Sequence, residues 1–104
     1  MINAIDATQL SNRKVNDTRI QTELEYMDAA IRSAAEEGRY FANHTLKDGT
    51  WLGTSHNNGG HRYLTALGER LNDELRKLGY TMRYDPYSLS TATIITISWG
   101  KPHA

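Results

Sequence analysis

The chain has 104 residues, 12 Lys and Arg against 12 Asp and Glu, and no cysteine. This length suits a single domain, and the balanced charge excludes the basic excess on which non-specific nucleic-acid binding depends. The lack of cysteine excludes disulfides and thiolate chemistry, and no apolar stretch approaches the roughly 20 residues that span a bilayer.

A domain of this size buries only about two thirds of the surface of its unfolded chain. We therefore expect part of the chain to rely on a partner or on self-association. The first residues lack the basic segment and apolar run of a secretion signal, so none is predicted.

Residues 1–16 are harder to assign than the rest. Asn3 is a candidate N-cap, and three apolar residues follow at helical spacing: Ala4, Ala7 and Leu10. The polar run at residues 11–14 then breaks the pattern. We predict a short helix or an ordered arm here. Such an arm could be a loosely tethered terminus, or it could dock on a neighbouring subunit.

The clearest helix is predicted at residues 17–37, with Asn16 or Asp17 as its cap and Gly38 after its end. Its apolar residues form one stripe: Ile20, Leu24, Met27, Ile31 and Ala34. The stripe favours a core-facing helix over a coiled-coil seam. A helix of about 21 residues is roughly 31 Å long, so we expect one end to project past the core.

A second helix is predicted at residues 61–78 from evenly spaced leucines, and Gly79 should end it. These leucines are Leu64, Leu67, Leu71, Leu75 and Leu78. Gly68 lies inside this helix, where glycine costs up to about 1 kcal/mol relative to alanine. We therefore expect the first helix or a strand to approach closely at Gly68.

Three strands are predicted, at residues 39–44, 80–84 and 92–99, with the last one central. Ile95, Ile97 and Trp99 should face the core. The outward face of the sheet is half polar and forms a candidate interface of Phe41, Arg83, Ile94 and Thr96.

The predicted fold class is therefore α+β. Two long helices pack on one face of a small, two- to three-stranded antiparallel or mixed sheet with a C-terminal β-hairpin. Residues 17–100 form a single domain, and residues 101–104 form a tail.

A loop rich in turn residues is predicted at residues 45–60. Asp48-Gly49 should form a tight hairpin turn between residues 45–46 and 51–52. The glycines at its end run into the expected start of the second helix, where backbone N–H groups and the helix dipole favour an anion. The candidate ligand-binding residues are Lys47, Trp51, Ser55, His56, Asn58, Gly59, Gly60, His61 and Arg62.

This loop matches neither the P-loop pattern nor the dinucleotide fingerprint, so a long turn with helix-capping residues is the alternative interpretation. Ser55 and His56 are adjacent, but adjacency is not the geometry of a catalytic triad. His56 and His61, with Asp48 or His44 nearby, match no metal-binding motif, and a metal-assisted enzyme that uses them is a third, weaker interpretation. We therefore predict no enzymatic activity, no cofactor and no metal site.

Three runs carry a family resemblance. They are residues 31–40, residues 74–82 with the sequence Glu-Leu-Arg-Lys-Leu-Gly-Tyr-Thr-Met, and the closing Ile95-Thr96-Ile97-Ser98-Trp99. The chain resembles, from Ile5 almost to its end, a group of small tailed-phage proteins. They share a first helix that ends in glycine, a second helix that ends in Lys-Leu-Gly-Tyr, and a terminal Ile-Ser-Trp strand.

The members of that group are mostly uncharacterised or called virion components. The resemblance implies a phage origin and a place in the virion or the host cytoplasm. Together with the residues above, it leads us to expect a non-enzymatic, homo-oligomeric structural or decoration-type component that contacts other phage particle proteins. The alternative is an anti-defence protein that binds and sequesters a nucleotide signal through the loop at residues 45–60.

Overall fold

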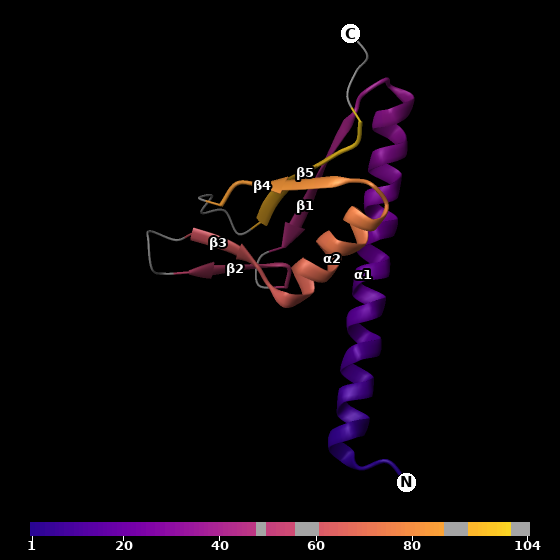
Figure 1. The fold of residues 1–104 in the computed structure, drawn as a ribbon, viewed down its shortest axis with the longest axis vertical. Helices are drawn as coiled ribbons and strands as arrows, with labels where there is room; N and C mark the ends of the chain where they lie inside the picture. Colours follow the sequence, from indigo (N-terminus) through magenta and orange to yellow (C-terminus); the bar gives the residue numbers. More distant parts are fainter. Residues whose placement is uncertain (48–49, 56–60, 87–91, 101–104) are drawn as a thin grey trace.

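The computed structural model describes residues 1–47, 50–55, 61–86 and 92–100. Its elements are, in chain order, α1 (Ala4–Glu36), β1 (Phe41–Lys47), β2 (Leu52–Ser55), β3 (His61–Leu64), α2 (Ala66–Lys77), β4 (Thr81–Tyr84) and β5 (Ala92–Ser98). The strands β1, β5 and β4 form a three-stranded antiparallel sheet, and β2 pairs with β3 in a separate two-stranded sheet (Figure 1). The α+β class and the central position of the last strand are confirmed.

One core joins both helices to the three-stranded sheet. Alternate residues of β1 and β5 are buried. Phe41 and Ile94, on the opposite face of these strands, are exposed. The buried cluster consists of Ile20, Met27, Ile31, Ala34, Ala42, Leu46, Trp51, Leu71, Leu75, Ile95 and Ile97. Tyr80 and Trp99 pack against this cluster, and their two rings meet edge to face with centroids 6.0 Å apart. The predicted inward side of β5 is thus confirmed for Ile95 and Ile97.

The helix α1 is continuous over 33 residues, so the expected helix start at Asn16 or Asp17 is wrong. Its cap is Asn3, whose Oδ1 accepts a hydrogen bond of 2.8 Å from the backbone N–H of Asp6. The polar residues at 11–14 do not end the helix, because only glycine and proline strongly disfavour a helix interior. The hydroxyl of Thr18 donates a hydrogen bond of 2.9 Å to the carbonyl of Lys14, one helical turn earlier.

Gly38 and Gly79 end the two helices as predicted, in left-handed conformations with φ of 81° and 92°. The backbone N–H of Arg39 donates to the carbonyl of Ala34 at 2.9 Å, and that of Tyr80 donates to the carbonyl of Leu75 at 3.0 Å. These bonds use carbonyls that a helix end leaves without partners.

The second helix begins five residues later than predicted, and residues 61–64 are strand β3. The N-cap is Thr65, whose hydroxyl accepts a hydrogen bond from the N–H of Gly68 at 3.1 Å and donates to the carbonyl of Thr50 at 2.8 Å. The prediction was wrong because Leu64 has the spacing of the helix leucines. In the structure, Leu64 pairs with Leu52 across the β2–β3 ladder.

The expected hairpin between residues 45–46 and 51–52 is also wrong, although its turn at Asp48-Gly49 lies outside the described residues. Thr45 and Leu46 pair instead with Ile94 and Thr93 of β5. Residues 52–55 form β2, so the predicted loop contains a strand. The β-branched β5 is a better partner for β1 than a short hairpin arm, because cross-strand side-chain pairs stabilise a sheet.

A histidine–carboxylate contact fastens α1 to β1 at the border of the core. The Nε2 of His44 is hydrogen-bonded to the Oε1 of Glu23, and the two side chains are 14% and 18% exposed. Loss of either partner should destabilise the fold, because the remaining polar group would stay largely shielded from solvent with its desolvation uncompensated.

We expect Glu23→Ala to lower the free energy of unfolding by about 1–3 kcal/mol, since it leaves the partly buried His44 without this partner. Glu25→Ala is the matched control, because Glu25 is exposed on the same helix and should change stability by less than about 0.5 kcal/mol. Urea denaturation monitored by circular dichroism measures both. Equal stabilities of the two variants would contradict the assigned role of the contact.

Candidate interaction surface: the projecting arm and a helix groove

Half of α1 extends beyond the rest of the molecule. We call residues 4–19 of α1 the arm. None of its residues is buried, and Ala7 and Asn16 alone are half-buried. Figure 1 shows this part of α1 running away from both sheets and from α2 towards the N-terminus. The first helix does project past the core, but through residues 4–19, almost all of which precede the helix start predicted at Asn16 or Asp17.

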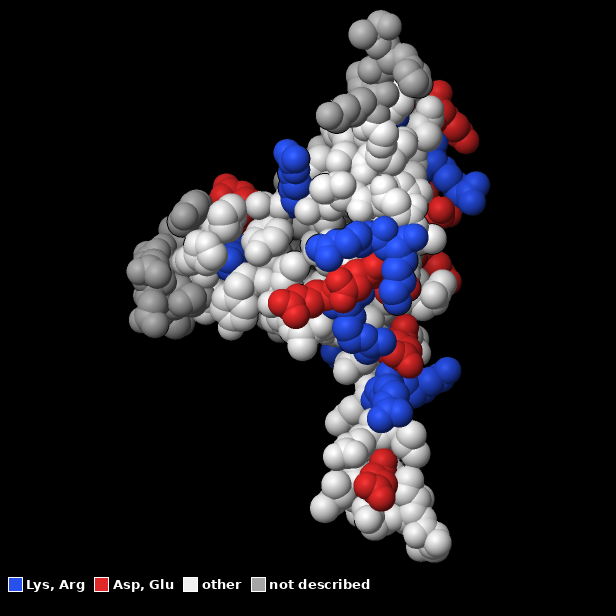
Figure 2. Space-filling view, in the orientation of Figure 1, with Lys and Arg blue, Asp and Glu red and all other residues white. Residues whose placement is uncertain are grey.

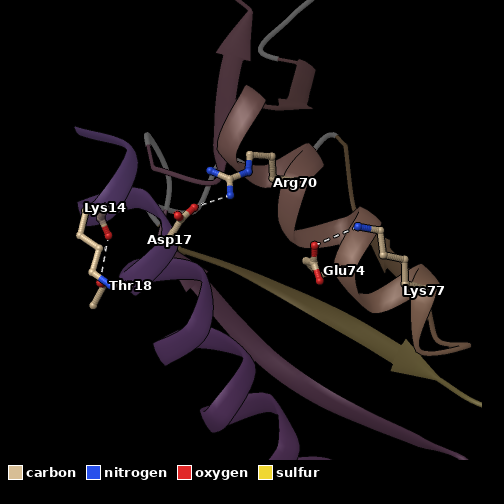
Figure 3. Close-up of polar contacts among 6 residues, drawn as sticks. All are labelled: Lys14, Asp17, Thr18, Arg70, Glu74 and Lys77. Carbon is tan, nitrogen blue, oxygen red and sulfur yellow. Dashed lines mark hydrogen bonds and ion pairs between the residues drawn. The ribbon is translucent and has the colours of Figure 1, made fainter. Parts of the chain in front are cut away.

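A single ion pair joins the base of the arm to α2 among the described residues. The Nη2 of Arg70 lies 2.6 Å from the Oδ1 of Asp17 (Figure 3). Both side chains are 50% exposed. Exposed pairs of this kind contribute about 0–1 kcal/mol. The pair therefore orients the arm at its base but contributes little to keeping the rest of the arm helical.

The residues of the arm form helix weakly by themselves. Many of them are Asn, Ser, Thr, Val or Asp, each of which costs up to about 0.7 kcal/mol relative to alanine. The large apolar residues near and along the arm are all exposed: Ile2, Ile5, Leu10 and Val15. Figure 2 shows mainly uncharged side chains over the end of the arm, and mixed charges where α2 meets α1. This surface fits a protein contact better than a purely solvated helix.

An apolar groove of about 220 Å³ lies between α1 and the C-terminal end of α2. Its lining consists of Leu24, Met27, Asp28, Ile31, Leu75, Leu78 and Tyr80. Leu78 continues the leucine spacing of the predicted second helix, but it is 67% exposed. Asp28 also bonds Arg32 at 2.8 Å, and this hydrogen bond and the charge of Asp28 raise the pKa of Arg32 above its ordinary value.

The predicted outward sheet face exists as a surface. Thr96 is paired in register with Asn43 on one side and with Arg83 on the other, and its hydroxyl lies 3.1 Å from the Oδ1 of Asn43. Phe41 and Ile94 are 43% and 64% exposed on the same face. The structure therefore brings together all four residues of the candidate interface, although two isolated apolar residues on a threonine-rich sheet face do not by themselves mark an interface.

The candidate ligand loop is only partly described, because His56, Asn58, Gly59 and Gly60 lie outside the described residues, as does the side chain of Ser55. The remaining residues do not form the expected arrangement. His61 and Arg62 belong to strand β3, so no helix N-terminus follows the loop directly. Trp51 is buried in the core at 5% exposure and cannot stack on a base, and Arg62 is only 2% exposed. Lys47 is exposed at the end of β1.

Neither the groove nor most of the exposed apolar residues in and next to the arm were predicted. Ile2, Ile5 and Val15 fall outside the core stripe of α1, and that mismatch was the available signal. The groove had no signal in the sequence, because it forms only where Tyr80 folds back beside the exposed end of α2.

Comparisons with protein-family models, with curated proteins and with solved structures find no match for this chain. Neither described helix is both long and apolar enough to cross a membrane. Among the described residues, no three His, Cys, Asp or Glu side chains are grouped so that they could hold a metal ion. The arm, the groove and the sheet face are the candidate interaction surfaces of this chain.

Proposed function

We propose that this chain is a non-enzymatic structural protein that acts as a homo-oligomer through protein–protein contacts, as a small virion component of a tailed phage. The single observation that carries the oligomer is surface area. The chain exposes 7434 Å², whereas a compact monomer of its 11.8 kDa exposes about 5,900 Å².

The extended shape of the chain also supports a homo-oligomer. The radius of gyration is 16.2 Å, against about 13 Å for a compact domain of this length. The placement in a phage particle is supported by the sequence resemblance alone. We further propose that β4 and β5 form a C-terminal hairpin and that both helices cover one face of the sheet, which leaves the other face and the arm to partners.

Two measurements test this function. Light scattering coupled to size exclusion should give a mass of at least twice the 11.8 kDa of the single chain, because the excess surface is covered in the oligomer. Mass spectrometry of purified phage particles should find the chain in several copies. A protein that is strictly monomeric in solution and missing from the particles would remove the proposal.

The alternative function, sequestration of a nucleotide signal, is favoured by no observation among the described residues, because Trp51 and Arg62 are buried and no helix begins at His61. It stays a prediction. A thermal-shift screen with cyclic and linear nucleotides tests it, since a ligand present at 100 times its Kd stabilises the folded state by about 2.7 kcal/mol.

A further inference from the structure

Two separate apolar sets lie along the same helix. The first is the end of the arm, where Ile2, Ile5 and Leu10 are 48%, 71% and 52% exposed. The second is the groove, to which α1 contributes Leu24, Met27, Asp28 and Ile31. The end of the arm is uncovered within the chain. In the groove, Met27 and Ile31 are buried, whereas Leu78 at its edge is 67% exposed. A rigid helix fixes the distance between the two sets.

We propose that the groove between α1 and α2 receives the end of the arm of a second copy of this chain, in a two-fold symmetric dimer with antiparallel α1 helices. This inference rests on the proposed function and names the partner and the contact. A two-fold axis places the arm end of each copy in the groove of the other copy, because in such a dimer every contact between two residues occurs twice.

The spacing along α1 fits this symmetry. With the axis beside Asn16 and Asp17, Ile5 lies opposite Asp28, and Ile2, which precedes the N-cap Asn3, lies near the level of Ile31. At 1.5 Å per residue, Ile5 and Asp28 are about 17 Å from the axis, and Ile31 is about 22 Å from it. The arm is therefore as long as the distance from the axis to the groove, so that no bend or extension is needed to bring the two together.

The exposed area also fits a dimer. The surface of the chain exceeds that of a compact monomer by about 1,500 Å², and a standard stable interface buries about 800 Å² per partner. The excess is thus enough for one such interface on each copy. The sheet face, whose exposed large apolar residues are Phe41 and Ile94, offers a less continuous apolar surface than the groove.

The contact also gives the arm its stability. Most helical stability in proteins comes from tertiary packing of an apolar face, and a segment without such packing depends on residues of high helix propensity, which the arm largely lacks. The arm has 16 residues between its start at residue 4 and the first buried residue, Ile20. Docking in the groove of a second copy supplies the missing packing.

Disulfide cross-linking tests the contact directly, because the natural chain has no cysteine. Ile5→Cys protein is mixed with Leu78→Cys protein under mild oxidation, and the fraction of the mixed disulfide is measured by mass spectrometry. Ile94→Cys replaces Leu78→Cys in the matched control, since Ile94 and Leu78 are 64% and 67% exposed. We expect the Ile5–Leu78 disulfide to form at least tenfold more than the Ile5–Ile94 disulfide.

The outcomes separate this inference from the proposed function. Equal cross-linking to both positions, or more to Ile94, in a protein that light scattering shows to be oligomeric would overturn the groove contact and leave the homo-oligomer standing. No cross-linking in a protein that is monomeric would overturn both. Circular dichroism of each variant confirms that it is folded, and all three replaced side chains are mostly exposed.

Discussion

Gly68→Ala is expected to destabilise the protein by about 1–3 kcal/mol, although replacing glycine by alanine inside a helix normally stabilises by up to about 1 kcal/mol. The reason is a close approach of backbone. A Cβ at Gly68 would lie 2.0 Å from the carbonyl oxygen of Trp51. That oxygen cannot move freely, because it accepts a hydrogen bond of 3.0 Å from the N–H of Thr65.

Gly53→Ala is the matched control. A Cβ at Gly53 would also overlap a neighbour, at 2.4 Å, but that neighbour is the end of the ring of Tyr63. Tyr63 is 49% exposed and can turn away into solvent. We expect a loss of less than about 1 kcal/mol there. Urea denaturation of both variants gives the comparison, and a Gly68→Ala protein as stable as the natural one would show that α2 does not start against Trp51.

Leu71→Ala is expected to lower the free energy of unfolding by about 2–5 kcal/mol, a large part of the total stability of a small domain. Leu71 has no exposed surface and belongs to the core that joins α2 to α1 and the sheet. Removing three carbons there costs both their transfer free energy and the cavity they leave.

Leu78→Ala is the control for Leu71→Ala, because Leu78 is 67% exposed at the end of the same helix. At concentrations where the protein is monomeric, we expect it to change stability by less than about 1 kcal/mol. Thermal denaturation of both variants measures the difference. Similar losses from the two leucines would contradict the assignment of Leu71 to the core and Leu78 to the surface.

Much of the fold could be predicted from local patterns. The stripe from Ile20 to Ala34 gave the buried side of α1, and Gly38 and Gly79 gave the ends of both helices. The alternation around Ile95 gave the inward face of the central strand. These features depend on periodicity and on backbone conformation, which neighbouring residues determine.

The errors concern long-range pairing. Leu64 has the spacing of the α2 leucines, and only its partner Leu52 places it in a strand. Gly68 was correctly expected to mark a close approach, but the neighbour is the backbone of Trp51, just before β2, and neither the first helix nor a strand. Trp51 itself has no core periodicity, and it is buried because α2 begins against the backbone of residues 50–51.

The candidate site was predicted unevenly. Phe41, Arg83, Ile94 and Thr96 share one face because strand alternation places them there. The anion site was built on a helix start at His61, and it lost its basis when residues 61–64 proved to be a strand. An uninterrupted arm was not predicted, since the polar residues at 11–14 resemble a break and yet none of them is glycine or proline.

The most direct test of self-association through the arm is sedimentation equilibrium of the full chain over a range of concentrations, together with Ile5→Asp and Ile94→Asp. Each variant places a charge on an exposed apolar residue, at 71% and 64% exposure. We predict a reversible dimer whose Kd rises at least tenfold in Ile5→Asp, a loss of about 1.4 kcal/mol, and is unchanged in Ile94→Asp. A natural chain that stays monomeric at all concentrations, or a dimer that only Ile94→Asp weakens, would contradict the account.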